Sequence, residues 1–406
     1  MNLRPKYETV ASLKEITENV RAVINSRKEK LTDAEVLELI EEYVLHGGKT
    51  ERCTFEKKSE MIRGVFNATR KELGLLQCFA EDREVSEIMV NGPGSIFIER
   101  RGKIEKIDRC FETTEELEEI IHRLAGKVHR EINDLSPILD ARMEDGSRIH
   151  AVNRNVAING PILSIRRFPE QSITINDLLQ WGTLSEEAAS LLEKLVICGW
   201  NIFVSGGTSS GKTTLLNVLS GFIPKEERVV VIEDSAELQI QGVENLVRME
   251  CRSANVQGKG EVTIRQLICA SLRMRPDRII VGEVRGPEVM DMLQAMNTGH
   301  DGSLCTGHGN SPAGMLSRLE AMYLAAAPFP IDAVRTQIVE AIDVIIHLGR
   351  MPDKSRRVLE IVEVEGFRQG RYSVNTLFSY HSEKGLIPTG NQMRNTIKAE
   401  RKGIVL

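Results

Sequence analysis

Hydrophobic positions recur at helical spacing along residues 1–76. The repeat covers three stretches, which are residues 12–30, 31–48 and 55–74, and it indicates three amphipathic helices. In the last stretch, the residues on one side are Met61, Val65, Phe66 and Leu73. The region is predicted to be a small helical bundle, which serves either as a docking arm or as a solubilising extension.

Helix boundaries in this region are marked by polar residues. Thr32 and Glu35 have the spacing of a capping box at the start of the second helix, and Gly47 is a stop signal. These signals support the predicted bundle.

The pattern changes at residue 77. Short alternating runs, separated by the turn sequence NGPG at 91–94, indicate strands. A capped helical stretch at 113–128 follows, and then two more hairpin-like strands, ILDARMEDGSRIHAV and GPILSIRRFP, end near Phe168. Residues 77–172 are therefore predicted to form a smaller α+β domain, and PEQSI at 169–173 is predicted to be the linker.

From residue 173 onward, helical stretches alternate with short apolar runs. The runs read NIFVSG, RVVVIED, RIIVGEV, GSLCTGH and DVIIHLGR. Strands this apolar are usually buried on both faces of a sheet that is covered by helices. Residues 173–406 are therefore predicted to form an α/β domain with its chemistry at the carboxyl ends of the strands.

Composition narrows the functional classes. The 406 residues carry a formal net charge of -5, and aromatic residues make up only 4%. The charge argues against a general nucleic-acid binder, and the scarcity of aromatics argues against a base-stacking platform. The seven cysteines never form a CxxC pair, which is typical of a reducing compartment. Because neither a signal peptide nor a membrane helix is expected, the prediction is a cytoplasmic protein that meets the membrane only through partners.

The sequence VSGGTSSGKTT at 204–214 is a phosphate-binding loop between an apolar strand and a helix. Its backbone amides and the helix N-terminus favour phosphate oxygens, so ATP and Mg²⁺ are the predicted ligands. Lys212 is expected to reach the β- and γ-phosphates, and the Thr213 hydroxyl is expected to bind the metal. The predicted nucleotide-binding residues are Gly206, Gly207, Thr208, Ser209, Ser210, Gly211, Lys212, Thr213 and Thr214.

Carboxylates end two other apolar strands. Gly282 stands where the aspartate of a Walker B strand normally falls, and Glu283 follows it. Glu283 is predicted to act on Mg²⁺ through a bound water; the alternative is an ordinary strand-end carboxylate. Glu233, Asp234 and Glu237 end the other strand, and one of them is a candidate to polarise the attacking water, unless the segment is simply a solvated loop.

Two histidines flank the GSLCTGH strand. His300 and His308 are candidates to sense or position a γ-phosphate, and a structural role is the alternative for each. A metal site with Cys305 is disfavoured, because residues 305 and 308 face opposite sides of an extended strand and no fourth ligand is evident.

These four segments, in this order, resemble the type II/type IV secretion ATPase superfamily. The marks are a Walker A loop, an Asp box (VIEDSAEL), a Walker B strand ending Gly-Glu (RPDRIIVGEVRG) and a His box (TGHDGSLCTGHGNSP). SEIMVNGPGSIFIERRGKIE, GPILSIRRF and the helical arm look most like the CpaF-type motor of tight-adherence (Flp) pilus assembly. The resemblance extends over about residues 77–365.

The resemblance implies a RecA-like P-loop NTPase domain, preceded by a PAS-like α+β domain, in a hexameric ring with ATP between the two domains. The implied catalytic residues are Glu237, Glu283, Arg148, Arg166, His300 and His308. Of these, Glu237 matches the proposed general base, and Arg148 and Arg166 match arginines that approach the phosphates. Arg167 is the alternative to Arg166, because adjacent strand residues point to opposite faces.

The predicted function is therefore an ATP-hydrolysing hexameric motor that powers tight-adherence pilus assembly or type II/IV secretion. Its expected partners are inner-membrane platform proteins and, indirectly, pilin subunits, with no direct contact to nucleic acid. A DNA-transfer ATPase of the conjugation type and a nucleotide-regulated scaffold are the alternatives. Gly307 and Gly309 depart from the usual His box, and they are predicted to loosen the turn that carries His308.

Overall fold

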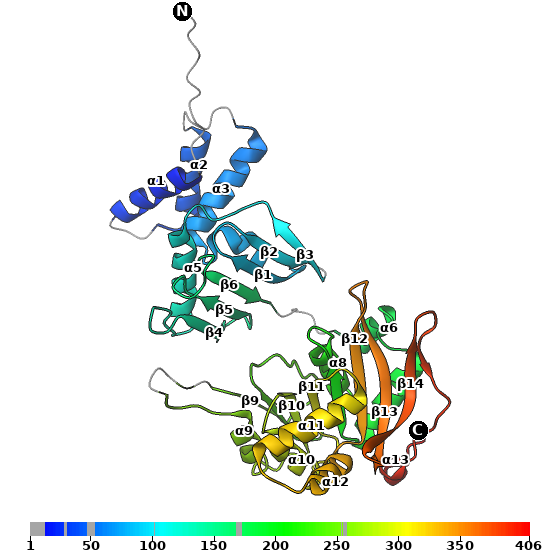
Figure 1. Cartoon of the computed structure of the whole chain (residues 1–406). Coiled ribbons are helices and arrows are strands. Elements are labelled where there is room, and N and C mark those ends of the chain that lie inside the picture. Colours follow the sequence, from blue (N-terminus) through cyan, green and yellow to red (C-terminus); the bar gives the residue numbers. More distant parts are fainter. Residues whose placement is uncertain are drawn as a thin grey trace, which may run out of the picture. The chain divides into compact units, whose positions relative to one another are not determined.

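The computed structural model describes residues 13–27, 31–46, 53–100, 102–167, 173–252, 254 and 258–406. The chain divides into two compact units, residues 1–170 and 171–406 (Figure 1). The predicted stop at Gly47 and most of the predicted linker lie outside the described residues.

The first unit begins with three helices, α1 (Leu13–Ser26), α2 (Asp33–Leu45) and α3 (Phe55–Arg70). They pack around a small apolar core that includes Val20, Ile40 and Val65. The capping box is confirmed, because Thr32 and Glu35 exchange the two expected hydrogen bonds. Leu73 lies beyond the end of α3 and packs against the next core instead, so its assignment to the bundle was wrong.

The α+β part of this unit is built on an antiparallel sheet. Its strands are β1 (Val85–Asn91), β2 (Ile96–Arg100), β3 (Lys103–Ile107), β4 (Ile138–Arg142), β5 (Arg148–Val152) and β6 (Ile162–Arg166), in the order β3-β2-β1-β6-β5-β4. Alternate residues give the sheet one apolar face, and α5 (Thr114–Lys127) packs on that face. The short helices η1 (Gly74–Leu76) and α4 (Gln77–Ala80) connect the bundle to β1.

The helical bundle is attached to the α+β part by side chains of α5. Arg123 Nη1 donates hydrogen bonds to the carbonyl oxygens of Lys71 and Glu72, both at 3.1 Å. Arg21 of α1 forms an ion pair with Glu119 at 3.6 Å. Bundle and sheet therefore belong to one unit, although each has its own apolar core.

The second unit contains a nine-stranded sheet. Its strands are β7 (Ile202–Gly206), β8 (Val229–Glu233), β9 (Leu246–Glu250), β10 (Arg278–Val284), β11 (Leu304–His308), β12 (Val344–Arg350), β13 (Arg356–Arg368), β14 (Arg371–His381) and β15 (Gly385–Pro388). The order is β15-β14-β13-β12-β7-β11-β10-β8-β9, parallel from β12 to β9 and antiparallel from β12 to β15. The five predicted strands are confirmed. The antiparallel extension β13–β15 was not predicted.

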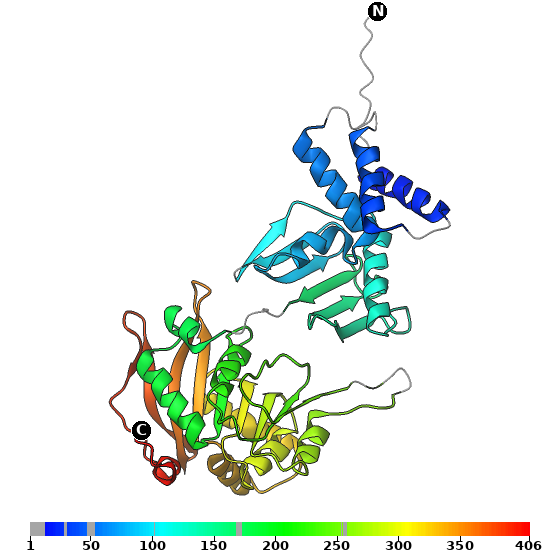
Figure 2. The same ribbon diagram turned by 180° about the vertical axis from the view of Figure 1, so that it is seen from behind.

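Helices cover both faces of this sheet, as the apolar strands indicated (Figures 1 and 2). One layer contains α6 (Ile175–Gln180), α7 (Glu186–Cys198), α8 (Lys212–Ser220) and α13 (Ile397–Lys402), and the other contains α9 (Ile264–Ser271), α10 (Val289–Met296), α11 (Pro312–Ala326) and α12 (Ile331–Ala341). Each face of the sheet has its own apolar core beneath its helix layer. Alternate residues of β7 contribute to both cores, because Val204 packs in the first and Phe203 in the second. The α/β class is confirmed.

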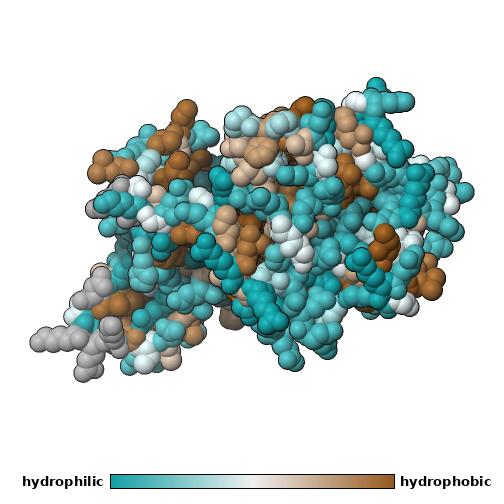
Figure 3. All heavy atoms as spheres, turned by 90° about the horizontal axis from the view of Figure 1, so that it is seen from below, coloured by the Kyte–Doolittle hydropathy of each residue, from teal (hydrophilic) through white to brown (hydrophobic). Residues whose placement is uncertain are grey.

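Hydrophilic side chains dominate the face shown in Figure 3, with apolar residues between them. In the part of the chain that the structure describes, no helix combines the length and apolarity that a membrane span requires.

Candidate functional site

The predicted phosphate loop connects β7 to α8. Gly211 is the N-cap of α8 and has φ 97°, a left-handed conformation that glycine adopts without strain. Ser209 is also left-handed, with φ 57°, and the Ser210 hydroxyl donates to the Gly207 carbonyl at 2.9 Å. The loop therefore presents a tight backbone turn at the start of a helix, the arrangement that binds phosphate oxygens.

Lys212 is the first residue of α8, and its side chain is buried. Its Nζ donates hydrogen bonds to the Gly206 and Gly207 carbonyls at 3.3 and 3.0 Å, and it lies 3.4 Å from His308 Nδ1. Burial lowers the pKa of the Lys212 ammonium, while Glu283 opposes the shift. The amine is thus held within the loop, beside the end of a neighbouring strand.

Glu283 and His308 meet at the carboxyl ends of β10 and β11. His308 Nε2 lies 2.8 Å from Glu283 Oε1, but that buried oxygen makes no hydrogen bond of good geometry. Arg285 donates to the other oxygen, Oε2, from Nε at 2.9 Å and from Nη2 at 2.6 Å. A buried carboxylate oxygen without a well-aligned donor fits a cation, so Glu283 suits the predicted metal role.

The environment of His308 favours the neutral imidazole. Burial lowers its pKa, and the nearby positive charges of Lys212, Arg285 and Arg318 act in the same direction, whereas Glu283 opposes them. A neutral imidazole has one nitrogen that accepts and one that donates, so it can lie between an ammonium and a carboxylate. The structure therefore brings together three predicted site residues, Lys212, His308 and Glu283.

The glycine in the Walker B position has a packing reason. A Cβ atom at Gly282 would lie 3.1 Å from Glu233 Cγ. Glu233 is buried, and its Oε1 accepts hydrogen bonds from the backbone N–H groups of Glu237 and Leu238, both at 2.7 Å. Glu233 thus occupies the space that an aspartate at 282 would require, and it orders the following segment.

That segment contains Glu237, which is half-buried. Two residues later, the Gln239 amide donates to Asn217 Oδ1 on α8 at 2.8 Å. The helix that follows the phosphate loop therefore holds the segment, although β8 is three strands away from β7. The role of Glu237 as a general base stays a prediction.

His300 lies apart from this group. It precedes β11, whose first residue pairs with the first residue of β7, so it stands at the edge where the parallel strands begin. Its Nδ1 lies 3.0 Å from the Ala295 carbonyl near the end of α10. The phosphate loop lies at the opposite edge of the sheet, where the parallel strands end. The structure does not bring His300 together with Lys212, and its catalytic role stays a prediction.

The glycines around His308 are tightly packed. A Cβ atom at Gly307 would lie 2.8 Å from Phe203 Cζ, and one at Gly309 would lie 2.8 Å from Ser205 Oγ. Neither residue has a positive φ, so close approach rather than freedom explains both. The expectation that they loosen the turn is wrong, and His308 ends a well-packed central strand.

The predicted arginines lie on neighbouring strands of the first unit, where Arg148 pairs with Arg166. Asp140 holds the Arg148 guanidinium through two hydrogen bonds, at 3.0 and 2.7 Å. Arg166 is exposed, whereas Arg167 Nη1 donates to the backbone carbonyls of Asp82 and Val85 at 2.5 and 3.4 Å. Arg167 is thus engaged within its own domain, which favours Arg166 as the arginine that is presented to a ligand.

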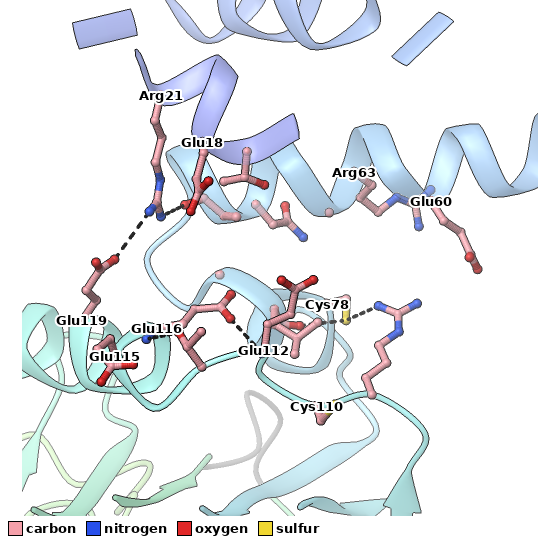
Figure 4. A pocket seen from close by; sticks show the side chains of 18 residues that line it. Glu18, Arg21, Glu60, Arg63, Cys78, Cys110, Glu112, Glu115, Glu116 and Glu119 are labelled. Carbon is pink, nitrogen blue, oxygen red and sulfur yellow. Dashed lines mark hydrogen bonds and ion pairs between the residues drawn. The ribbon is translucent and has the colours of Figure 1, made fainter. Parts of the chain in front are cut away.

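A cavity of about 460 Å³ in the first unit lies between the helical bundle and α5. Figure 4 shows its charged lining, with Arg21 directed toward Glu119. Six glutamates and three arginines line it. This excess of carboxylates disfavours phosphate groups, so the phosphate loop remains the candidate nucleotide site.

Three residues near the loop were not predicted. Arg285 follows the Gly-Glu pair and lies 3.7 Å from Asp234, so it links the Asp box to Glu283. Arg356 on β13 donates from Nε to the Ser209 carbonyl at 3.0 Å. His347 on β12 is buried and lies 3.1 Å from Ser205 Oγ. The RPDRIIVGEVRG segment contains Arg285 and could have indicated it. The contacts of Arg356 and His347 with the loop depend on the order of the strands in the sheet, which was not predicted.

Residues 70–398 match the family model described as type II/IV secretion system protein. Proteins of similar sequence include three whose names state conjugal transfer or type IV secretion. A putative conjugal transfer protein of Mycobacterium tuberculosis is 34% identical over 319 residues, which cover 77% of this chain and 89% of that protein. The probable conjugal transfer protein TrbB of Sinorhizobium fredii is 33% identical, with 76% and 92% covered. The type IV secretion system protein PtlH of Bordetella pertussis is 30% identical, with 69% and 90% covered.

Solved structures with a similar fold include those of an ATPase and of a pilus motor. The ATPase DotB of Legionella pneumophila aligns with a TM-score of 0.52 and 20% identity, over 72% of this chain and 79% of that chain. The pilus retraction motor PilT, solved with bound ADP, aligns with a TM-score of 0.51 and 19% identity, over 81% and 86%. At such identities the likeness concerns the fold, an N-terminal domain followed by a RecA-like domain.

Proposed function

Because this chain belongs to the type II/IV secretion ATPase superfamily, we propose that it is a Mg²⁺-dependent ATPase that drives a secretion or pilus machine. One observation carries the proposal: the buried Lys212 and the half-buried His308 and Glu283 converge beside the phosphate loop, at the carboxyl ends of β7, β11 and β10. Parallel sheets bind nucleotides at that edge. The arrangement supports phosphoryl chemistry rather than a merely structural glycine turn.

The proposed ligand set follows from this geometry. The loop amides from Gly206 to Thr214 and the Lys212 ammonium hold the phosphates, and Thr213 and Glu283 hold Mg²⁺. The metal, when bound, neutralises charge on the β- and γ-phosphate oxygens. His308, which is favoured as a neutral imidazole, lies beside the Glu283 carboxylate and within reach of Lys212, and Arg285 orients that carboxylate through its other oxygen.

Hydrolysis requires a base and further positive charge. Glu237 is proposed to accept the proton of the attacking water, because its segment is held against α8 by Asn217. Arg148 and Arg166 are proposed to neutralise the transferring phosphoryl group, a role worth ~10³–10⁵ in rate in P-loop enzymes. His300, the first His-box position, is also proposed to act in catalysis.

The test is nucleotide binding and turnover of purified Lys212→Ala. We expect ATP binding to weaken by at least a factor of ten and phosphate release to fall close to background, because a buried cation at the phosphates is lost. Lys225→Ala, which removes an exposed lysine of the same unit, is the matched control. Normal turnover by Lys212→Ala would refute the proposed site.

Glu237→Gln separates binding from chemistry. The variant keeps the hydrogen-bonding shape but removes the base, so ATP affinity should persist while turnover falls by ~10²–10⁴. If assembly of the machine survives the loss of turnover, the chain acts as a nucleotide-regulated scaffold rather than as a motor.

The biological setting is proposed at a finer level. A hexameric ring at the cytoplasmic face of the inner membrane would act on platform proteins, and through them on pilins of a tight-adherence pilus. Analytical ultracentrifugation with a non-hydrolysable ATP analogue should give a hexamer mass. A monomer at all nucleotide concentrations would contradict the ring.

Conjugal DNA transfer is the second candidate. The names of the similar Mycobacterium tuberculosis and Sinorhizobium fredii proteins favour it, whereas the net charge of -5 argues against direct DNA contact. ATP turnover with and without single-stranded DNA, at 50 and ~200 mM salt, separates the two readings. Salt-sensitive stimulation by DNA would favour transfer over pilus assembly.

A further inference from the structure

The phosphate loop is contacted from a strand far along the chain. Arg356, the first residue of β13, lies 147 positions after Ser209, and its Nε donates to the Ser209 carbonyl at 3.0 Å. The same side chain runs along the outside of the loop, because its Cδ lies 3.4 Å from where a Gly211 Cβ would be. The arginine therefore contacts the loop at Ser209 and lies beside Gly211, although it is outside the GxxxxGKT motif.

The contact meets the loop at its strained residue. Ser209 has φ 57°, a left-handed conformation that costs free energy for a residue other than glycine. A left-handed residue turns its peptide groups, and such turns direct successive N–H groups toward an anion. A charge-assisted hydrogen bond to the Ser209 carbonyl offsets the strain, because it fixes the orientation of that peptide group.

The start of β13 is itself held in place. The Thr183 hydroxyl donates to the Arg356 carbonyl at 3.0 Å, and the Val358 amide donates to the Thr183 carbonyl at 3.1 Å. Arg357 donates to the Trp181 carbonyl. The segment after α6 thus fixes the backbone of Arg356, and the hydrogen bond to Ser209 holds its exposed side chain against the loop.

We propose that Arg356 is a positioning residue of the nucleotide site. It holds the Ser209 peptide in the orientation that binds phosphate, and it places a permanent positive charge beside the loop for a nucleoside di- or triphosphate. The inference rests on the proposed nucleotide binding. Because the effect acts on the loop and not on the reacting bond, it changes substrate and product binding equally.

The experiment measures ADP binding to the full chain by calorimetry. Arg356→Ala should weaken binding about ten-fold, the loss expected for one hydrogen bond to a charged group. Arg356→Lys keeps the charge and one donor, so it should recover most of the affinity. Arg350→Ala is the matched control, because Arg350 lies directly opposite on β12 and is exposed; it should bind like the wild type.

A kinetic readout separates positioning from damage to the fold. In Arg356→Ala, KM for ATP should rise about ten-fold while kcat stays within about two-fold of the wild type. Thr183→Val, which releases the strand start, should weaken ADP binding in the same direction by a smaller factor. If Arg356→Ala binds ADP like the wild type, or if Arg350→Ala loses as much, the inference is wrong. No ADP binding by the wild type would instead refute the proposed function itself.

Discussion

Gly307→Ala distinguishes two explanations of the His-box glycines. If Gly307 provides flexibility, alanine should be neutral or stabilising by ~0.4–1 kcal/mol, because it reduces the entropy of the unfolded chain. The structure predicts instead that alanine at this position destabilises the fold. The added Cβ would lie 2.8 Å from Phe203 Cζ and 3.2 Å from Met315 Cε, and both neighbours are fully buried.

The magnitude follows from this overlap. Overpacking a well-filled core costs ~1–3 kcal/mol, and the entropic gain of alanine offsets ~0.5–1 kcal/mol. The difference lies between about 0 and about 2.5 kcal/mol, and its central part, about 1–2 kcal/mol, corresponds to a decrease in Tm of about 2–8 °C for a unit of this size.

Tryptophan fluorescence is the assay, because Trp181 and Trp200 are the chain's two tryptophans and both lie in the second unit. Thermal unfolding followed at this signal reports on the sheet that contains β11. Gly207→Ala is the control, since a Cβ there meets nothing within 4 Å. A Tm for Gly307→Ala equal to or above that of the wild type would refute the packing argument.

Three further outcomes are expected. Gly282→Asp should lower the urea-derived free energy of unfolding by about 2–4 kcal/mol at pH 7, because the aspartate adds a second carboxylate against the buried Glu233. Burial already raises the pKa of Glu233. Gly282→Ala adds no charge and should lower the free energy of unfolding by less. Burial lowers the pKa of His347 from 6.5, so stability should fall as pH drops below 6.5, and His347→Gln should show a smaller decrease in Tm between pH 7.5 and 5.5 than the wild type. Arg285→Ala removes a positive charge that lowers the pKa of His308, so the acid limb of the pH–rate profile should move to higher pH; an unmoved limb would disconnect Arg285 from that titration.

The sequence predicted the elements with strong local signals. The five buried strands, the phosphate loop and the Thr32 capping box all follow from periodicity and turn chemistry, and the structure contains each of them. The meeting of Lys212, Glu283 and His308 was expected because parallel strands end at one edge of a sheet. Such patterns depend on residues near one another in sequence.

What the sequence did not predict depends on contacts between distant segments. Arg356 reaches Ser209 only because β13 extends the sheet next to β12, and an antiparallel ladder at a sheet edge leaves no apolar run as strong as that of β7. The two His-box glycines suggested a loose turn, since a pattern shows the missing side chain but not the Phe203 ring that fills its place. His300 was grouped with His308 by motif, although the intervening strand separates them.

The strand order of the second unit has a consequence for synthesis on the ribosome. β7 carries the phosphate loop and is central, but both of its neighbours, β11 and β12, come about a hundred or more residues later. At 5–20 residues per second, β7, which is fully buried in the folded unit, remains without its ladder partners for on the order of 10 s after it is made. A chain released early would expose both edges of this strand. Truncations before β12 should therefore yield aggregated products that depend on chaperones, and not smaller working domains.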